Sequence, residues 1–378
     1  MNLTIDREVL LENLNIISRG LPSKSPMPIL TGIKFYTTDT DLFLTSSNSD
    51  ISVEVKISES LVVNELGSAV VIGKLFIDII RRINSPKVNI YLSDDKILII
   101  KADRGEYKLK IMDVLTYPRI DFVPAENGLV LHSDVIKSLI KETVFATAQS
   151  EKKPILVGVN FAKKGNELIV TATDSFRLSQ KITIIDEYKD FNITIPNKSL
   201  EELVRSLDNY DGNINLYFTQ NRLLVLFKNV HFQTRLLDGT YPDTSRLIPS
   251  SFPVVIKFNK DELVEAVERV SLLSPRDRER DKEIVYSIIK LSIRKDRTVE
   301  ISTNNNIYGD AREEIIPTYV DAENPISIGF SSRYLLEALR SFMSTEISLN
   351  LTGDIKPFII RGDKDANLTQ LILPVRMD

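Results

Sequence analysis

The feature of this sequence that most constrains its fold is an internal repeat that runs through the whole chain. One copy begins at Pro28 with PILTGIKFYTTDTDLFLTSSNSDISVEV, and a second begins at Pro154 with PILVGVNFAKKGNELIVTATDSFRLSQK, an offset of 126 residues. A weaker third copy begins at Tyr286 with YSIIKLSIRKDRTVEISTNNNIYGDARE. Three offsets of this size account for all 378 residues. The chain is therefore expected to be three diverged copies of one domain.

The second halves of the copies also correspond. A short strand followed by a helix is predicted by VVIGKLFIDIIRRI from Val70, ITIPNKSLEELVRSL from Ile193 and ISIGFSSRYLLEAL from Ile326. The first two copies end with the same dipeptide, at Tyr117-Pro118 and Tyr241-Pro242. In the first halves, equivalent places are occupied by Thr45, Thr171 and Ser302.

Hydrophobic periodicity predicts the elements within a copy. The segments 51–57 and 107–111 alternate apolar and polar residues, which is typical of half-buried strands. Six segments carry a helical period, two in each copy: Arg7–Ser18, Lys74–Ile83, Ser133–Val144, Asn197–Leu207, Lys260–Leu273 and Ser331–Phe342. The apolar face predicted for 74–83 includes Leu75. An α+β fold is expected, with two helices and antiparallel sheets in each of the three domains.

Loop-forming residues predict the domain boundaries. The segment PAENG at 124–128 separates the first two copies, and IPSSFP at 248–253 separates the second from the third. We expect domains at residues 1–125, 126–250 and 251–378.

Composition excludes several classes of protein. The chain has no cysteine, which rules out a disulfide framework, a thiol nucleophile and a cysteine zinc site. Its two histidines, His132 and His231, are far apart in sequence, so neither a metal nor a cofactor is expected. No leader peptide and no membrane-spanning stretch is predicted, and the protein is expected to be cytoplasmic. No phosphate-binding loop or catalytic motif is present, which argues against an enzyme.

Four motifs in order and at matching spacing give the chain a recognisable family. PILTGI lies near the start, TDSFRL in the middle copy, DGTYPDTSRLIP at its end and LILPVR near the C-terminus. In these motifs the chain resembles the bacterial DNA sliding clamp, the β subunit of DNA polymerase III. The resemblance implies a non-catalytic processivity factor that forms a ring as a head-to-tail homodimer of six similar domains. Duplex DNA is expected to pass through the ring.

The charge distribution in the sequence does not identify a DNA-facing surface, which therefore rests on the resemblance. The net charge is −4, and the six predicted helices together carry no net charge. Helix 74–83 does place three basic residues on its polar face. The DNA-binding residues that the resemblance implies are Lys24, Lys74, Arg81, Arg82, Lys137, Lys141, Gln149, Lys198 and Arg205.

The resemblance also implies a hydrophobic groove that binds short linear peptides. Its partners would be the replicative polymerase, the clamp loader and repair proteins. The residues that match the family's groove are Leu156, Thr173, Ser175, Phe176, Arg177, Leu178, Pro242, Arg246, Leu247, Ile372, Leu373, Pro374, Val375 and Arg376. Phe176 departs from the family pattern, in which a histidine commonly precedes the arginine.

Two other interpretations remain open from the sequence. A protein-interaction scaffold that never meets DNA would share the groove but need no basic helix faces. An enzyme with an active site between duplicated domains would need polar residues that are specific to one copy. The copy-specific residues of TDSFRL and LILPVR are largely apolar, and this favours the clamp.

Overall fold

The computed structural model describes residues 1–93, 96–125, 127–150, 152–185, 188–274, 287–305 and 308–376. They belong to two compact units, one of Met1–Lys137 with Lys198–Leu236 and one of Ser138–Asn197 with Leu237–Asp378. The division runs through the central repeat, so each unit contains half of its strands. In the part of the chain that is described, no helix is long and apolar enough to cross a membrane.

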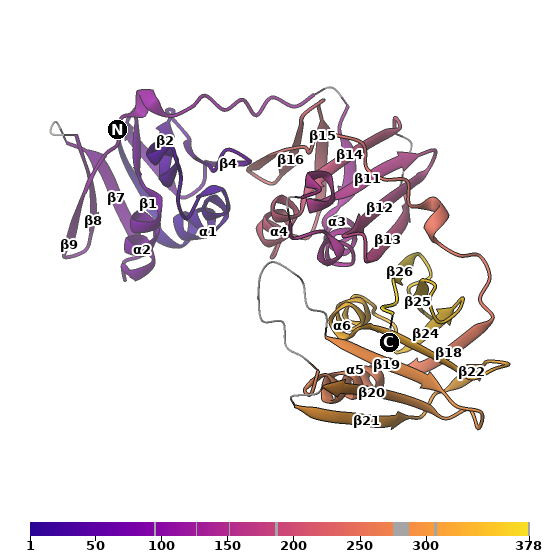
Figure 1. Cartoon of the computed structure of the whole chain (residues 1–378). Helices are drawn as coiled ribbons and strands as arrows, with labels where there is room; N and C mark the ends of the chain where they lie inside the picture. Colours follow the sequence, from indigo (N-terminus) through magenta and orange to yellow (C-terminus); the bar gives the residue numbers. More distant parts are fainter. Residues whose placement is uncertain are drawn as a thin grey trace. The chain divides into compact units, whose positions relative to one another are not determined.

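The first unit contains two antiparallel sheets (Figure 1). One has five strands in the order β5 (Leu61–Glu65), β1 (Asn2–Asp6), β7 (Lys87–Leu92), β8 (Ile97–Ala102) and β9 (Gly105–Lys110). The other has eight, in the order β10 (Leu129–His132), β15 (Asn213–Phe218), β16 (Arg222–Phe227), β17 (Val230–Arg235), β4 (Ile51–Ile57), β3 (Leu42–Ser47), β2 (Gly32–Thr37) and β6 (Gly67–Ile72). Pairing of β17 with β4 joins the second repeat to the first, and it sets buried Phe232 opposite buried Val53.

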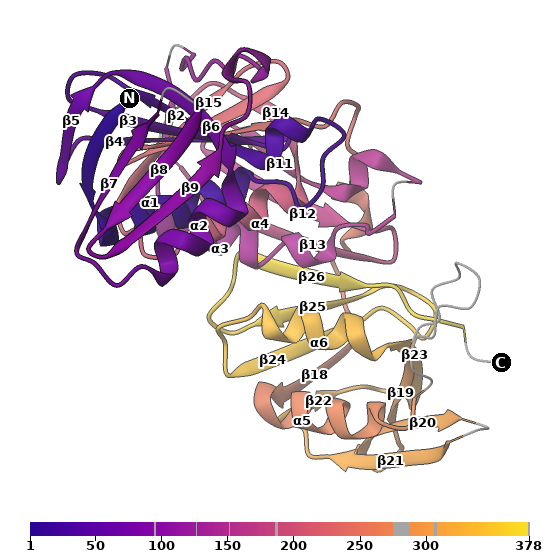
Figure 2. The same ribbon diagram turned by 90° about the vertical axis from the view of Figure 1, so that its left-hand side faces the viewer.

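The second unit is built in the same way. Its nine-stranded sheet has the order β14 (Phe191–Pro196), β11 (Gly158–Lys164), β12 (Glu167–Thr173), β13 (Arg177–Ile184), β26 (Leu368–Ile372), β25 (Phe358–Gly362), β24 (Glu346–Leu351), β18 (Val254–Asn259) and β22 (Tyr319–Asp321). Its four-stranded sheet has the order β21 (Gly309–Ile315), β20 (Val299–Asn305), β19 (Ile288–Ile293) and β23 (Ile326–Ser331). Figure 2 shows β13 and β26 side by side, where the second and third repeats join.

Six α-helices lie in the described residues: α1 (Arg7–Ile17), α2 (Gly73–Arg82), α3 (Ser133–Lys141), α4 (Asn197–Ser206), α5 (Lys260–Ser271) and α6 (Ser332–Arg340). Side-chain caps fix where α1 and α5 begin. The Asp6 side chain accepts hydrogen bonds from the backbone N–H groups of Glu8 and Val9 at the start of α1. The Asn259 side chain accepts those of Asp261 and Glu262 at the start of α5. Helix α5 buries residues at helical spacing, Leu263, Ala266, Val267 and Val270, and packs against α6.

Strand register confirms the alignment of the three repeats residue by residue. Thr45 pairs with Lys34, Thr171 pairs with Asn160, and Ser302 pairs with Lys290. Each pair joins the second and third strands of its own repeat. The three domains are therefore copies of one strand order, although their side chains have diverged.

The tyrosines that end the first two repeats have equivalent structural roles. The Tyr117 hydroxyl donates to the Thr45 carbonyl at 3.3 Å, and the Tyr241 hydroxyl accepts the Thr173 N–H at 3.0 Å. Burial raises the pKa of both phenols, which therefore stay protonated at neutral pH. Each tyrosine ties the end of its repeat back to that repeat's third strand, β3 or β12.

Three expectations from the sequence need correction. The helix predicted for 133–144 ends at Lys141, because the Thr143 hydroxyl bonds back to the Leu139 carbonyl at 2.6 Å and a 3₁₀ turn follows at Val144–Ala146. Leu75 was expected in the buried face of its helix but is 47% exposed. Tyr107 was expected in a half-buried strand but is 40% exposed, because β9 is the outer strand of its sheet.

Candidate functional site

The C-terminal segment lies beside the TDSFRL motif of the central repeat. Strands β13 and β26 set Arg177 opposite Ile372, and the pairing continues as the Leu373 N–H donates to the Phe176 carbonyl at 2.9 Å. Two residues later the Val375 N–H donates to the Gly329 carbonyl at 2.7 Å. The two distant parts of the sequence from which a groove was expected are thus held together by backbone hydrogen bonds.

An apolar cluster lies at this junction. Leu178, Ile359 and Leu371 are buried there, and Leu373 packs against them. The linker between the second and third repeats contributes Ile248 and Phe252 to the same cluster. Sequence reasoning missed these two, although the apolar residues within the linker IPSSFP were a signal that it packs against something.

The rim of the candidate groove is exposed. Phe176 is 45% exposed and Leu247 is 50% exposed, and Pro242 and Arg246 are also exposed. A hydrogen bond from the Ser245 backbone lowers the pKa of the neighbouring Asp243. The rim therefore presents two large apolar side chains between an acidic and a basic group, which is the mixture that peptide-binding grooves use.

A tight turn shapes the region between β12 and β13. Ser175 has φ +81°, and its N–H donates to the Thr173 hydroxyl at 3.1 Å. That hydroxyl in turn donates to the Arg177 carbonyl at 2.6 Å. Thr173 is buried, and its hydroxyl stabilises the turn through both hydrogen bonds. Ser175 is exposed.

Arg177 is buried and lies in an ionic network rather than on an open surface. It is 5% exposed and stacks on Tyr334, with its guanidinium carbon 4.3 Å from the ring centre. Its Nε donates to Asp174 at 3.0 Å, and its terminal nitrogens donate to Glu337 and to the Phe145 carbonyl. Leu156 and Ile372 are buried as well, and Ile372 belongs to the main core of the third repeat.

The residues proposed to contact DNA are mostly on the surface. Eight are exposed: Lys24, Lys74, Arg81, Arg82, Lys141, Gln149, Lys198 and Arg205. Lys137 differs, since its side chain is half-buried and its Nζ donates to the Tyr210 carbonyl at 2.7 Å. Arg81 pairs with Asp78 at 3.6 Å, and Arg205 pairs with Glu202.

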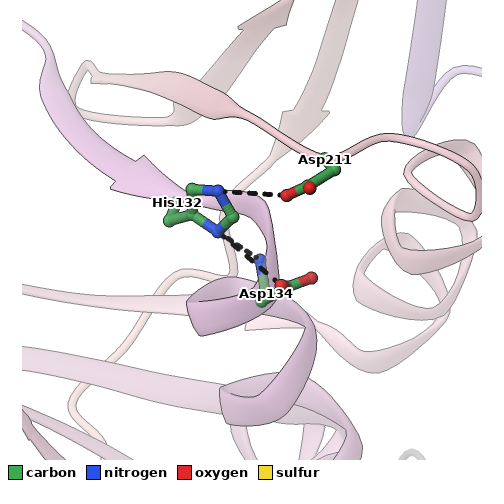
Figure 3. A group of neighbouring side chains, drawn as sticks. All are labelled: His132, Asp134 and Asp211. Atoms are coloured by element: carbon green, nitrogen blue, oxygen red, sulfur yellow. Dashed lines mark hydrogen bonds and ion pairs between the residues drawn. The ribbon is translucent and has the colours of Figure 1, made fainter.

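His132 lies between the carboxylates of Asp134, its near neighbour in the sequence, and Asp211, 79 residues later (Figure 3). Its Nε2 is 3.2 Å from Asp211, and its Nδ1 is 3.8 Å from the Asp134 carboxylate. The Asp134 backbone N–H also donates to Nδ1 at 3.4 Å. The two ring nitrogens face different carboxylates, and all three side chains are exposed.

Family models match the chain along nearly its whole length. The model for the N-terminal domain of the DNA polymerase III beta subunit matches residues 1–121. The models for its central and C-terminal domains match residues 130–243 and 245–376.

Individual relatives agree with these models. A protein of Bacillus subtilis named beta sliding clamp is 35% identical over 384 residues, which cover all of both chains. Among solved structures, the DNA polymerase sliding clamp of Bacillus subtilis superposes with a TM-score of 0.94 at 35% identity and full coverage of both chains. The beta subunit from DNA polymerase of Streptococcus pyogenes gives 0.93 at 30% identity, again with full coverage.

We predict that Arg177 is essential for stability at the junction between the second and third repeats. Replacing it with methionine should lower the free energy of unfolding by about 3 kcal/mol, because Asp174 and Glu337 would lose a shared partner in a buried setting. Urea denaturation measures the change.

Arg333→Gln is the matched control. Arg333 pairs with the same Glu337 at 3.0 Å but is itself 47% exposed, so its loss should cost less than about 1 kcal/mol. A loss for Arg177→Met no larger than for Arg333→Gln would show that the network contributes little.

Proposed function

The chain belongs to the family of the DNA polymerase III beta subunit, the beta sliding clamps, and we propose that two copies of it close head to tail around duplex DNA and slide along it. In this role it is a non-catalytic processivity factor that tethers the replicative polymerase. The observation that carries the proposal is the succession of all three family domains, in order, in a chain that matches its relatives from end to end. This pattern favours the clamp over a scaffold without DNA contact and over an enzyme.

The strand order supports ring closure, because the chain already joins its repeats twice by the same kind of strand pairing. Each repeat has two runs of three consecutive strands that pair in order, such as β2-β3-β4 and β7-β8-β9 in repeat one. The last strand of a run has one edge that no other strand of its own repeat occupies. The first run of repeat one ends in β4, which pairs with β17 from the second run of repeat two. The first run of repeat two ends in β13, which pairs with β26 from the second run of repeat three.

Among the described strands of the first and third repeats, one such last strand in each has no partner strand from another repeat. These are β21, which ends the first run of repeat three, and β9, which ends the second run of repeat one. Both are outer strands of their sheets, and an open edge is a template for pairing with another chain. Antiparallel pairing of β9 in one copy with β21 in another continues this strand pairing and gives a head-to-tail dimer.

The charges of the two edges are complementary. Strand β9 carries Glu106, Lys108 and Lys110, a net charge of +1, and all three are exposed. Strand β21 carries Asp310, Arg312, Glu313 and Glu314, a net charge of −2. Hydrogen bonds from Arg269 lower the pKa of Glu313, so this carboxyl is ionised at neutral pH. Opposite charges on two edges favour the pairing of β9 with β21 over self-pairing of either strand.

We assign DNA contact to basic residues of the helices and loops, all of them exposed except the half-buried Lys137. The set is Lys24, Lys74, Arg81, Arg82, Lys137, Lys141, Lys198 and Arg205, with Gln149 as a neutral member. A net charge of −4 argues for weak contacts with phosphates that exchange readily, which suits a ring held on DNA by topology.

The groove at the second junction is proposed as the partner site. Leu247 and Phe176 at its rim and Leu373 at its wall suit leucine and phenylalanine anchors of short linear peptides. The partners are the replicative polymerase, the clamp loader and repair proteins. The proposed domain limits, 1–125, 126–250 and 251–378, fall in the linkers, and the proposed location is the cytoplasm, where the DNA of bacteria lies.

Retention on DNA should depend on the topology of the DNA. With the cognate clamp loader and ATP, the protein should stay on a nicked circular plasmid through gel filtration, because a closed ring cannot leave a circle. Cutting the plasmid once should release it, since weak phosphate contacts alone do not hold it. Equal retention on circular and linear DNA would contradict a sliding ring.

Reversing the charge of the β9 edge should weaken the dimer. Lys108→Glu with Lys110→Glu is expected to raise the dimer dissociation constant about tenfold or more, because it places like charges on facing edges. Analytical ultracentrifugation measures the constant.

A compensating pair tests the partner strand. Adding Asp310→Lys and Glu314→Lys in β21 should restore association. Lys164→Glu with Lys228→Glu, two exposed lysines of the second repeat, which contains neither β9 nor β21, should leave association unchanged. Dissociation that is equal in the β9 variant and in the Lys164 and Lys228 control would show that the dimer does not form through this edge.

Removal of the C-terminal segment should abolish peptide binding. Deleting residues 373–378 removes Leu373 from the groove wall, and Leu247→Ala should cost about 1–2 kcal/mol of peptide binding without destabilising the fold, because Leu247 is an exposed anchor. Calorimetry with a peptide carrying leucine and phenylalanine anchors measures both.

Two controls separate binding from folding. Leu115→Ala removes a 93% exposed leucine of the first repeat, which contributes no residue to the groove, and should change neither property. Thermal melts should stay cooperative in all variants. Unchanged peptide affinity in the deletion would mean that the groove lies elsewhere, even if the ring assignment stands.

A further inference from the structure

A cavity of about 230 Å³ lies in the first unit, where the first and second repeats share a sheet. Its walls come from the turn between β3 and β4, the segment that follows Tyr117, and the ends of β16 and β17. This volume is below that of most sites for drug-sized ligands and fits one or two amino-acid side chains.

The cavity corresponds to the peptide groove of the second junction, one repeat earlier. Ser49 has φ +80° and Ser175, 126 residues later, has φ +81°. At the first junction the Arg235 N–H donates to the Asp50 carbonyl at 3.1 Å. At the second junction the Leu373 N–H donates to the Phe176 carbonyl at 2.9 Å. The turn and the hydrogen bond that extend the shared sheet are therefore the same at both junctions.

The lining residues correspond as well. Leu30 and Ser47 line the cavity, and their counterparts 126 residues later are Leu156 and Thr173 of the proposed groove. Pro118 lines the cavity where the groove has Pro242. The first junction thus repeats the framework of the second.

The side chains that differ between the junctions change what the cavity prefers to bind. Asp50 takes the place of Phe176, Ser52 that of Leu178 and Arg235 that of Leu373. The Ser52 hydroxyl bonds to that of Ser47 at 2.9 Å, so this pair is satisfied. Three positions that carry apolar side chains at the groove therefore carry polar or charged ones at the cavity.

Arginines dominate the charge of the cavity. Arg222 and Arg235 are directly opposite each other on β16 and β17, and both are exposed. Like charges at opposed positions destabilise a sheet, and neither arginine forms an ion pair with another residue in the described part of the chain. Arg119 adds a third guanidinium, whose Nε donates to Asp121 at 3.1 Å. With one carboxylate, Asp50, the lining carries a net charge of +2.

Apolar groups complete the walls. Met27, which is 45% exposed, lines the cavity with Leu30, Pro118 and Ile120. A ligand that fits must therefore bring carboxylates to the arginines and an apolar group to this wall. Guanidinium forks bind carboxylates in pairs of hydrogen bonds, which gives both strength and orientation.

We propose that this cavity is a second peptide-binding groove, which takes a short linear segment of a partner protein with an apolar residue between two acidic ones. The inference rests on the proposed peptide groove at the second junction. An anion placed between Arg222 and Arg235 relieves their mutual repulsion, so binding is expected to be strongest where both arginines are present.

A methionine inside the cavity supplies a direct reporter. The chain has five methionines, and ¹³C-methyl labelling gives each one a resonance in NMR spectra. Met27→Leu identifies the Met27 signal. The probe is a peptide of about eight residues with blocked termini and a central Glu-Leu-Glu flanked by glycine and serine; its control carries Gln-Leu-Gln.

The Met27 signal should shift saturably with the Glu-Leu-Glu peptide. Arg222→Gln with Arg235→Gln should weaken this binding about tenfold or more, because two charged hydrogen-bonding groups are lost. Arg104→Gln, an exposed arginine at the β8–β9 turn, should leave it unchanged. No saturable shift, or equal shifts with the Gln-Leu-Gln peptide, would overturn the proposal.

Two further measurements separate this proposal from others. Inorganic phosphate or deoxyadenosine monophosphate that binds more tightly than the acidic peptide would overturn the assignment to a peptide. The peptide with leucine and phenylalanine anchors should bind the arginine variant as it binds the unaltered protein. Failure of that apolar peptide to bind either protein would refute the groove at the second junction, whatever the Met27 signal does.

Discussion

Antiparallel pairing between the edges of consecutive repeats is the interaction on which the rest of this structure depends. A domain built from two open sheets leaves edges that attract other strands. Here β4 pairs with β17 and β13 pairs with β26, which gives two continuous sheets of eight and nine strands. Backbone hydrogen bonds need no particular side chains. The pairing has therefore persisted while the three copies diverged until the third is hardly recognisable in the sequence.

Because the backbone maintains each junction, its side chains can specialise. At the second junction the end of the shared strand pair holds Phe176 and Leu373, and buried Arg177 fixes the turn through Asp174 and Glu337. At the first junction the same backbone positions hold Asp50 and Arg235. One framework thus presents an apolar surface at one junction and a cationic surface at the other. Gene duplication followed by divergence of a few residues is sufficient to produce this difference.

The sequence predicted the fold well and the site in part. Periodicity located the six helices of the described residues, five of them to within two residues at each end, since each has a regular apolar stripe. It could not show that Leu75 and Tyr107 are exposed, because exposure depends on which other elements pack against the helix or strand. The burial of Arg177 depends on Glu337, 160 residues away, and the setting of His132 depends on Asp211. Contacts of this range leave no local pattern. The cavity at the first junction did have a signal, since SSNSDIS (46–52) aligns with ATDSFRL (172–178) in the repeat.

Because the same strand pairing joins every pair of neighbouring repeats, the pairing does not depend on where the chain begins and ends. The junctions within the chain and the proposed junction between copies use the same backbone pairing. A linker therefore only keeps two repeats close together, and the strands determine how they join. Such an architecture should accept circular permutation: a chain opened in the 124–128 linker and joined at its old termini would carry the same three repeats in a new order. The ring could then be cut and rejoined at any domain boundary without altering which strands meet. What one species encodes as a dimer of three-domain chains, another could encode as a trimer of two-domain chains.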